Sequence, residues 1–304
     1  MAVTWLWAGF VLIMGVMLVL DLGVFQKKSH AMAVREAAIM VAIWWALALA
    51  FCGAVFFVYG HDKALQFLSA YILEQSLSVD NLFVFILVFS FFNIAPENQP
   101  RILHWGILGA IAMRFIFIFA GLSLLAVSHL MFYVFGAILV WTGGKMLVSS
   151  SEEELEPGNN SALRLLHRFL PVTKSPHGHR FFTRIDGVLH ATPLFAALIV
   201  IEASDLIFAV DSIPAALGVS SDLFVVYTSN IFAVMGLRSM YFLLAGSMNQ
   251  FHYLKTGVSV VLIFVGLKMV AQEHYHMPTL WSLAFIAAAL GTSIAASLLK
   301  PQRA

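Results

Sequence analysis

The sequence has little charge and almost no cysteine. Only 11% of its 304 residues are charged, about half the share of a typical soluble domain, whereas 61% are hydrophobic. A water-soluble chain could not cover that much apolar surface, which excludes a soluble enzyme, a nucleic-acid-binding protein and a disordered protein. The single cysteine, Cys52, excludes a disulfide framework and a cysteine metal cage.

Several functional motifs are missing as well. The first ten residues have no basic segment, so we expect no signal peptide. The chain has no HExxH, GxSxG or P-loop motif, which leaves intramembrane proteolysis and ATP-driven transport without support. We therefore expect neither an enzyme nor a bound cofactor.

Long hydrophobic runs fill most of the chain. Crossing a bilayer takes about 20 mostly apolar residues in a helix. Nine stretches meet this requirement, and we expect one all-α transmembrane domain embedded in the lipid bilayer. The stretches cover residues 4–25, 38–59, 66–92, 102–125, 129–148, 193–217, 223–247, 255–272 and 278–298.

The basic residues predict the orientation of these spans. Twelve of the 17 Lys and Arg residues lie in alternate connections and in the C-terminal tail, whereas the opposite connections contain only Lys63. Because Lys and Arg concentrate on the cytoplasmic side, we expect the N-terminus outside and the C-terminus in the cytoplasm.

The one long connection, about 149–192, then lies in the cytoplasm. Its residues 161–170 have the apolar stripe of a short interfacial helix. Around Asp186-Gly187 the pattern predicts a β-hairpin with a type I′ turn. We interpret both as parts of a structured linker rather than a regulatory site.

The sequence also contains an internal repeat. Similar motifs recur 123 to 128 residues apart in three successive spans, and a unit of three spans must insert the second time upside down. Such an inverted 3+3 repeat is typical of secondary transporters, whose substrate site lies near the midplane between the units. We expect repeat one at about 66–148, repeat two at about 193–272, and peripheral helices at 4–25, 38–59 and 278–298. The matched residues are Glu74 and Glu202, Arg114 and Arg238, and Lys145 and Lys268.

Six acidic residues fall inside the predicted spans. Each costs about 2.5 to 3.5 kcal/mol at the centre of a membrane helix, so such residues need partners and usually mark a pathway. On ideal helices, Glu74 shares a stripe with Ser78 and Asn81, and Glu202 shares one with Asp205 and Ser212. Asp80 and Asp211 fall off these stripes by a third to half a turn. Pro214 is expected to break its helix and free the carbonyl of Val210 beside Asp211. The six are Asp21, Glu74, Asp80, Glu202, Asp205 and Asp211.

The chemistry of these side chains favours a hard divalent cation. Carboxylates, amides, hydroxyls and carbonyls suit Mn²⁺, Mg²⁺ or Ca²⁺ better than Zn²⁺ or Cu⁺. Excess negative charge without the metal also suggests proton exchange. The alternative is that the acids form structural ion pairs with the basic residues of the spans, and those bases could also replace the cation in the empty state. The four bases are Arg114, Lys145, Arg238 and Lys268.

At these motifs the sequence resembles the TerC family of integral membrane proteins, and within it the Alx-like bacterial members. The segments EQSLSVDNLFVF at 74–85 and IEASDLIFAVDSIPA at 201–215 are similar to its two signatures. The resemblance extends to FLPVTKS in the long loop and implies a LysE-superfamily-like inverted-repeat exporter in the bacterial inner membrane. It further implies manganese export, with a metal site formed by Glu74, Asp80, Glu202, Asp205 and Asp211 and flanked by Asn81 and Ser212.

Two other functions stay open. The long loop could make the protein a membrane scaffold in stress response or membrane biogenesis, or the carboxylates could serve an exporter of a small organic cation or amino acid. Among the remaining polar residues, Asp21 is as consistent with an interfacial position as with the pathway. The two histidine pairs, His274 with His276 and His177 with His179, lack the ligand count of a dedicated metal site.

Overall fold

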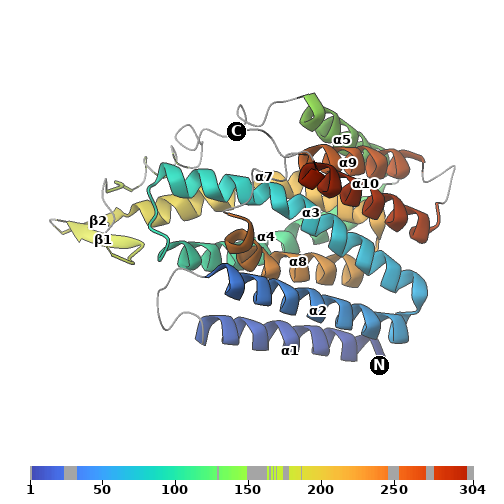
Figure 1. The fold of residues 1–304 in the computed structure, drawn as a ribbon, viewed down its shortest axis with the longest axis horizontal. Coiled ribbons are helices and arrows are strands. Elements are labelled where there is room, and N and C mark those ends of the chain that lie inside the picture. The colour runs from blue at the N-terminus through green and yellow to red at the C-terminus, as the bar shows by residue number, and fades with distance from the viewer. Residues whose placement is uncertain are drawn as a thin grey trace.

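The protein is a bundle of long apolar helices in the computed structural model (Figure 1). The structure describes residues 2–23, 33–128, 130–148, 163, 166, 168, 170–173, 178–185, 187–245, 253–271 and 277–299. Within these residues the helices are α1 (Ala2–Gly23), α2 (Val34–Tyr59), α3 (His61–Phe91), α4 (Gln99–Val127), α5 (Leu130–Val148), α7 (Pro193–Val219), α8 (Leu223–Leu244), α9 (Leu254–Ala271) and α10 (Thr279–Leu299).

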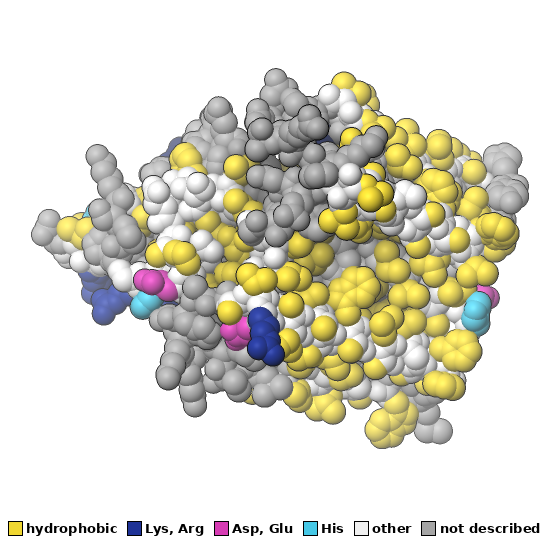
Figure 2. Space-filling view, in the orientation of Figure 1, with side chains coloured by type: hydrophobic (Ala, Val, Ile, Leu, Met, Phe, Trp, Pro, Cys, Tyr) yellow, Lys and Arg dark blue, Asp and Glu magenta, His cyan; other side chains and the backbone are white. Residues whose placement is uncertain are grey.

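These helices confirm the prediction of an all-α protein with many spans. Each of the nine predicted stretches corresponds to one helix of the described chain, and eight of the helices are long and apolar enough to cross a bilayer. Helix α1 adds a shorter apolar stretch, Thr4–Val19. Figure 2 shows a broad hydrophobic area over the middle of the bundle, with charged and histidine side chains towards its two ends. Such a surface fits a lipid environment.

One expectation about the helices is wrong. Pro214 does not break its helix, because α7 continues from Pro193 to Val219 with Pro214 inside it. The residue is buried, and packing of α7 against its neighbours holds the helix together on both sides of the ring. Proline still has no amide hydrogen, so the carbonyl of Val210 cannot accept the usual bond from four residues onward.

The centre of the bundle is formed by four helices. Helix α3 packs against α7 and α8, and α4 packs against the same two helices. On one side α2 covers α3 and α8, with α1 outside it, through a cluster of aromatic side chains that includes Phe10, Phe51 and Phe232. On the other side lie α5, α9 and α10 (Figure 1). The inner surfaces of α3, α4, α7 and α8 are therefore shielded from lipid.

Helices α5 and α9 approach each other closely enough for their backbones to touch. A Cβ atom built on Gly136 would lie 2.7 Å from the carbonyl oxygen of Gly266, and one built on Gly143 would lie 2.7 Å from that of Ser259. Small residues permit this kind of packing between membrane helices. No side chain larger than hydrogen fits at either glycine without a shift of the backbone.

The long connection contains the predicted hairpin, which projects from one end of the bundle while the N-terminus lies at the other (Figure 1). Strand β1 (Phe182–Ile185) pairs antiparallel with β2 (Val188–Ala191), and Gly187 in the turn has a φ of 81°. The structure also describes Leu163, Leu166 and Arg168 as helical, in agreement with the predicted short helix. The rest of that helix and Asp186 lie outside the described residues.

Candidate functional site

Arg114 is the centre of a buried polar cluster contributed by four helices. Its side chain is fully buried in the middle of α4. The guanidinium donates from Nη1 to Glu74 Oε1 of α3 and, over 2.8 Å, to Asn230 Oδ1 of α8. From Nη2 it reaches Asp205 Oδ1 of α7 over 3.4 Å. One side chain thereby connects all four central helices.

Several polar atoms in this cluster have no partner within the described chain. Each carboxylate uses only one oxygen for Arg114, which leaves Glu74 Oε2 and Asp205 Oδ2 without a hydrogen bond. The Nε of Arg114 and the Nδ2 of Asn230 are also unpaired. Buried polar groups are normally satisfied, so a cluster with this many open positions can accept a ligand.

The stripe predicted on α3 lies on its buried face. Glu74, Ser78 and Asn81 are all almost completely shielded from solvent. Residues three and four apart share one face of a helix, which explains why these polar side chains point the same way. The Oγ of Ser78 has no hydrogen-bond partner in the described chain. Helix α3 therefore presents a line of oxygen and amide groups that continues from the Arg114 cluster.

Glu202 lies next to the cluster but outside its hydrogen bonds. It is half-buried on α7, one turn before Asp205, and within the described residues no hydrogen bond reaches its carboxylate. Its side chain fills the space left by Gly109 of α4: a Cβ atom there would lie 2.1 Å from Glu202 Oε1. The absence of a side chain at Gly109 thus fixes where this carboxylate sits.

Asp211 belongs to a different surface of α7. Its Oδ1 accepts a hydrogen bond of 2.8 Å from Thr142 Oγ1 of α5, so the half-buried carboxylate faces α5. The neighbouring Ser212 is buried, and its Oγ has no partner in the described chain. This agrees with the prediction that Asp211 lies off the stripe of Glu202 and Asp205.

Part of the predicted site lies outside what the structure describes. The side chain of Asp80 is not described, although its backbone belongs to α3, and the same holds for Asp21 in α1. His177, His274 and His276 also lie outside the described residues. His179 is described, and its Nδ1 lies 2.5 Å from Asn98 Oδ1, so it links the loop before the hairpin to the start of α4.

The described carboxylates do not form a closed metal cage. Among the described residues, no group of three or more His, Cys, Asp or Glu side chains could hold a metal ion in this arrangement. Arg114 instead takes the position between Glu74 and Asp205. The predicted metal ligands are therefore divided between the Arg114 cluster, the Gly109 space and the α5 face of α7.

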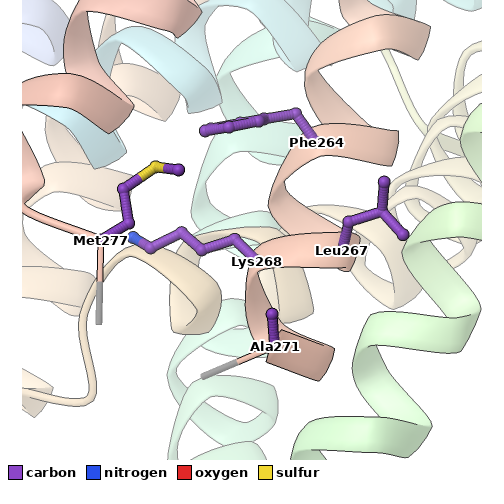
Figure 3. Close-up of a pocket in the computed structure, with 5 residues that line it drawn as sticks. All are labelled: Phe264, Leu267, Lys268, Ala271 and Met277. Carbon is purple, nitrogen blue, oxygen red and sulfur yellow. The ribbon is translucent and has the colours of Figure 1, made fainter. Parts of the chain in front are cut away.

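The paired lysines of the repeat lie in α5 and α9, not in the four helices that contribute the Arg114 cluster. Lys145 is exposed near the end of α5. Lys268 lines a cavity of about 240 Å³, and its amino end extends towards Met277 (Figure 3). Apart from this lysine, the cavity is lined by apolar side chains, so it does not have the ligands of a cation site. Arg238, the counterpart of Arg114, is buried in α8.

Sequence reasoning missed three residues that shape the site. Asn230 and Thr142 bind Arg114 and Asp211, and Gly109 makes room for Glu202. Asn230 had a usable signal, since an amide within an apolar span needs a partner as an acid does. Thr142 and Gly109 had none, because hydroxyls and glycines are common in membrane helices.

The chain was compared with known proteins. Residues 59–304 match the family described as "Integral membrane protein TerC family". An "Uncharacterized membrane protein STKORF319" of Myxococcus xanthus is 48% identical over 299 residues, which cover 98% of this chain and 93% of that protein. The Escherichia coli protein named "Putative membrane-bound redox modulator Alx" is 42% identical over 291 residues, which cover 92% and 90% of the two chains.

A plant protein matches as well. The "Thylakoid membrane protein TERC, chloroplastic" of Arabidopsis thaliana is 44% identical over 274 residues, which cover 90% of this chain and 70% of that protein. No solved structure matches the chain. The family match covers far more than half of the sequence and includes every helix of the Arg114 cluster, so the chain belongs to the TerC family of integral membrane proteins.

Proposed function

We propose that this membrane protein is a secondary transporter that exports a divalent cation, most readily Mn²⁺, from the cytoplasm by alternating access. The observation that carries the proposal is the cluster of Glu74, Asp205, Arg114 and Asn230 in the centre of the bundle. In this cluster each of the two buried carboxylates has one oxygen atom without a hydrogen-bond partner in the described chain. Ionisable groups at such a depth are costly and usually mark a transport pathway.

The ligand chemistry of the cluster supports a hard cation. Glu74 Oε2, Asp205 Oδ2 and Ser78 Oγ are buried oxygens without a partner in the described chain. Oxygen ligands of this kind suit Mn²⁺, Mg²⁺ and Ca²⁺. A dication compensates the charge of two carboxylates more fully than a singly charged ammonium does. This favours a metal ion over an organic cation as substrate.

The packing of α5 on α9 supports an inverted repeat. An offset of 123 residues relates Lys145 to Lys268, and the same offset relates Gly136 to Ser259 and Gly143 to Gly266. If the two repeats are exchanged by this offset, the contact of Gly136 with Gly266 is equivalent to the contact of Ser259 with Gly143. In both contacts, a Cβ atom built on the glycine of α5 would lie 2.7 Å from a carbonyl oxygen of α9. Two equivalent contacts of this kind are expected when a two-fold axis relates the repeats. Such an axis places the substrate site between them.

A polar cavity supports access from the side of the hairpin. It has a volume of about 500 Å³ and lies between the end of α3 and the end of α8, with Ser90, Asn93, Gln99 and Tyr241 among its lining residues. Asn98, beside it in sequence, binds His179 next to the hairpin. We assign this end to the cytoplasm from the distribution of Lys and Arg, and the N-terminus to the opposite side.

The single cysteine bears on the redox name of one relative. Cys52 lies in α2, and its Sγ donates to the carbonyl of Ala64 over 3.4 Å. With one cysteine the chain cannot form a disulfide within itself, so we do not propose thiol–disulfide chemistry for it. A scaffold role for the long loop is separated from transport by the experiment below, which changes only the membrane-embedded cluster.

The test is manganese transport by purified protein in liposomes. Asp205→Asn keeps the size of the side chain but removes a carboxylate from the cluster, and we expect Mn²⁺ transport to fall at least about tenfold. Asp222→Asn is the matched control, because Asp222 caps α8 outside the cluster and asparagine caps helices equally well. Transport that is unchanged in Asp205→Asn, or Mn²⁺ that never crosses with the wild-type protein, refutes the proposal.

Proton exchange is tested in the same liposomes. If export is coupled to proton entry, an imposed pH gradient should accelerate Mn²⁺ movement in wild type. If Mn²⁺ movement does not respond to the gradient but still depends on Asp205, export is not coupled to protons. The proposal of Mn²⁺ export would then stand without proton exchange.

A further inference from the structure

We propose that Arg114 is a built-in cation: its guanidinium occupies the ion site when no metal is bound, and the transported dication and Arg114 replace one another on Glu74 and Asp205. The inference rests on the proposed function and adds how the site is filled between transport steps. The starting observation is the position of the guanidinium, which joins both carboxylates and is shielded from solvent.

The bonding of Arg114 is that of a replaceable group. A structural arginine typically forms a fork of two parallel bonds to one carboxylate. Here each carboxylate receives a single bond, the contact with Asp205 Oδ1 is long at 3.4 Å, and Nε has no acceptor in the described chain. Part of the donor capacity is therefore unused. The second oxygens of both carboxylates point to no other partner, so they remain available to a metal ion.

Charge explains why the site needs a substitute cation. Two carboxylates inside an apolar bundle repel each other and have lost their hydration, and removing one partner of a buried ion pair is strongly unfavourable. A bound dication compensates both charges. When the dication leaves, Arg114 restores most of that compensation without any ion from solution, so the empty transporter can exist without exposing its carboxylates.

The cluster also spans both predicted repeats. Glu74 and Arg114 come from α3 and α4, whereas Asp205 and Asn230 come from α7 and α8. Exchanging Arg114 for a metal therefore alters contacts between the two units, which are the parts that move against each other in inverted-repeat transporters. Asn230 Oδ1, which accepts from Nη1, holds the arginine on the side of the second unit.

The proposal predicts opposite effects on binding and on net transport. Without the arginine, the metal has no internal competitor and binds more tightly. The empty protein, however, keeps two uncompensated carboxylates and cannot easily change conformation. Net export should then fail, while exchange of one Mn²⁺ for another should continue because that cycle never passes through the empty state.

The binding test measures the Kd of Mn²⁺ on purified protein at pH 8, where protons compete least. We expect Arg114→Met to bind about tenfold more tightly or better, since the apparent affinity is reduced by the fraction of sites that are blocked. Arg114→Lys keeps the charge but has one nitrogen in place of the two that contact Glu74 and Asp205, and it should fall between wild type and Arg114→Met. If Arg114→Met does not fold, the order of Arg114→Lys and wild type decides. Weaker or equal binding in the folded variants overturns the inference.

The transport test compares exchange with net efflux in liposomes. For Arg114→Met or, in its place, Arg114→Lys, the ratio of exchange to net efflux should rise at least about tenfold over wild type, in line with the binding shift. Lys63→Met is the control, because it removes an ion pair of 2.9 Å with Asp222 outside the cluster, and its ratio should match wild type. Equal loss of exchange and efflux overturns the inference, whereas wild-type protein that neither binds nor moves Mn²⁺ refutes the proposed function itself.

Discussion

The Arg114 cluster and the contact between α5 and α9 are both buried, yet they are built in opposite ways. At the α5–α9 contact the backbones of Gly136 and Gly266 touch, and the surrounding side chains are apolar. In the cluster, long charged side chains meet around Arg114 and leave several atoms unpaired. The first region fits too closely to admit anything else, whereas the second is held by bonds that a ligand can take over.

This difference separates stability from function. Close backbone packing gains dispersion energy that is lost when a single atom is added. Open polar positions cost stability, and proteins retain them mainly at functional sites. We therefore expect substitutions at the α5–α9 contact to affect folding first, and substitutions around Arg114 to affect transport first.

The largest effect is expected from Gly143→Ala. Its new methyl group would lie 2.7 Å from the backbone oxygen of Ser259, so α5 and α9 must separate. Overpacking of this kind typically costs about 1 to 3 kcal/mol of unfolding free energy. Thermal unfolding in detergent should show a clear drop in the midpoint.

Gly144→Ala supplies the matched control on the next residue. Nothing lies within 4 Å of a Cβ atom there, so this variant should be as stable as wild type or slightly more stable, because alanine favours a helix. Equal midpoints for the two variants would contradict the close packing assigned to Gly143.

An intermediate effect is expected from Gly109→Ala. The three atoms nearest to the added Cβ atom all belong to the end of the Glu202 side chain, which can rotate away, so the fold should survive while the carboxylate is displaced. We expect Mn²⁺ export to fall about tenfold, the size of effect that loss of one positioned charge commonly has. The measurement is the initial export rate per amount of folded protein.

Gly106→Ala, one turn earlier on α4, is the control for that variant. Its Cβ atom would make an ordinary contact of 3.4 Å with Ile201 and would not touch Glu202. Export that drops equally in both variants would show that α4 tolerates no added volume, and that the position of Glu202 is not the cause.

The smallest effect is expected from Thr142→Val, which links the two regions. The substitution removes the 2.8 Å hydrogen bond to Asp211 and keeps the shape of the side chain. One such bond contributes about 1 kcal/mol, so export should change about fivefold or less and stability only slightly. Thr292→Val, which loses only bonds within its own helix on the surface of α10, should leave export unchanged. If Thr142→Val lost more export than Gly109→Ala, Asp211 would be more important for export than Glu202.

The fold was largely predictable from the sequence, because hydrophobic length alone defines membrane helices. The nine long helices of the described part of the chain lie where apolar runs were found, and Gly187 marked the turn of the hairpin. Pro214 was misread, since its local effect is weaker than the packing that surrounds α7. Propensity yields to tertiary contacts when a residue is fully buried.

The charged residues of the Arg114 cluster were singled out from the sequence, but their arrangement was not. Helical periodicity placed Glu74 with Ser78 and separated Asp211 from Asp205. It could not show that Arg114 bridges two helices from different halves of the chain, because that contact depends on how the helices pack. The partner Thr142 is uncharged and its hydroxyl is common in membrane helices, so nothing marks it in a hydrophobic span.

The pairing of Glu74 with Arg114 also bears on how the protein enters the membrane. The two residues lie on consecutive helices, 40 positions apart, whereas Asp205 is synthesised 91 residues after Arg114. Each charge alone would make its helix a poor candidate for insertion, at about 2.5 to 3.5 kcal/mol. As a hairpin, α3 and α4 bring opposite charges together and can leave the translocation machinery as a pair whose two charges cancel. The contact between Glu74 and Arg114, which we propose fills the ion site in the folded protein, thus also favours the insertion of α3 and α4 into the membrane.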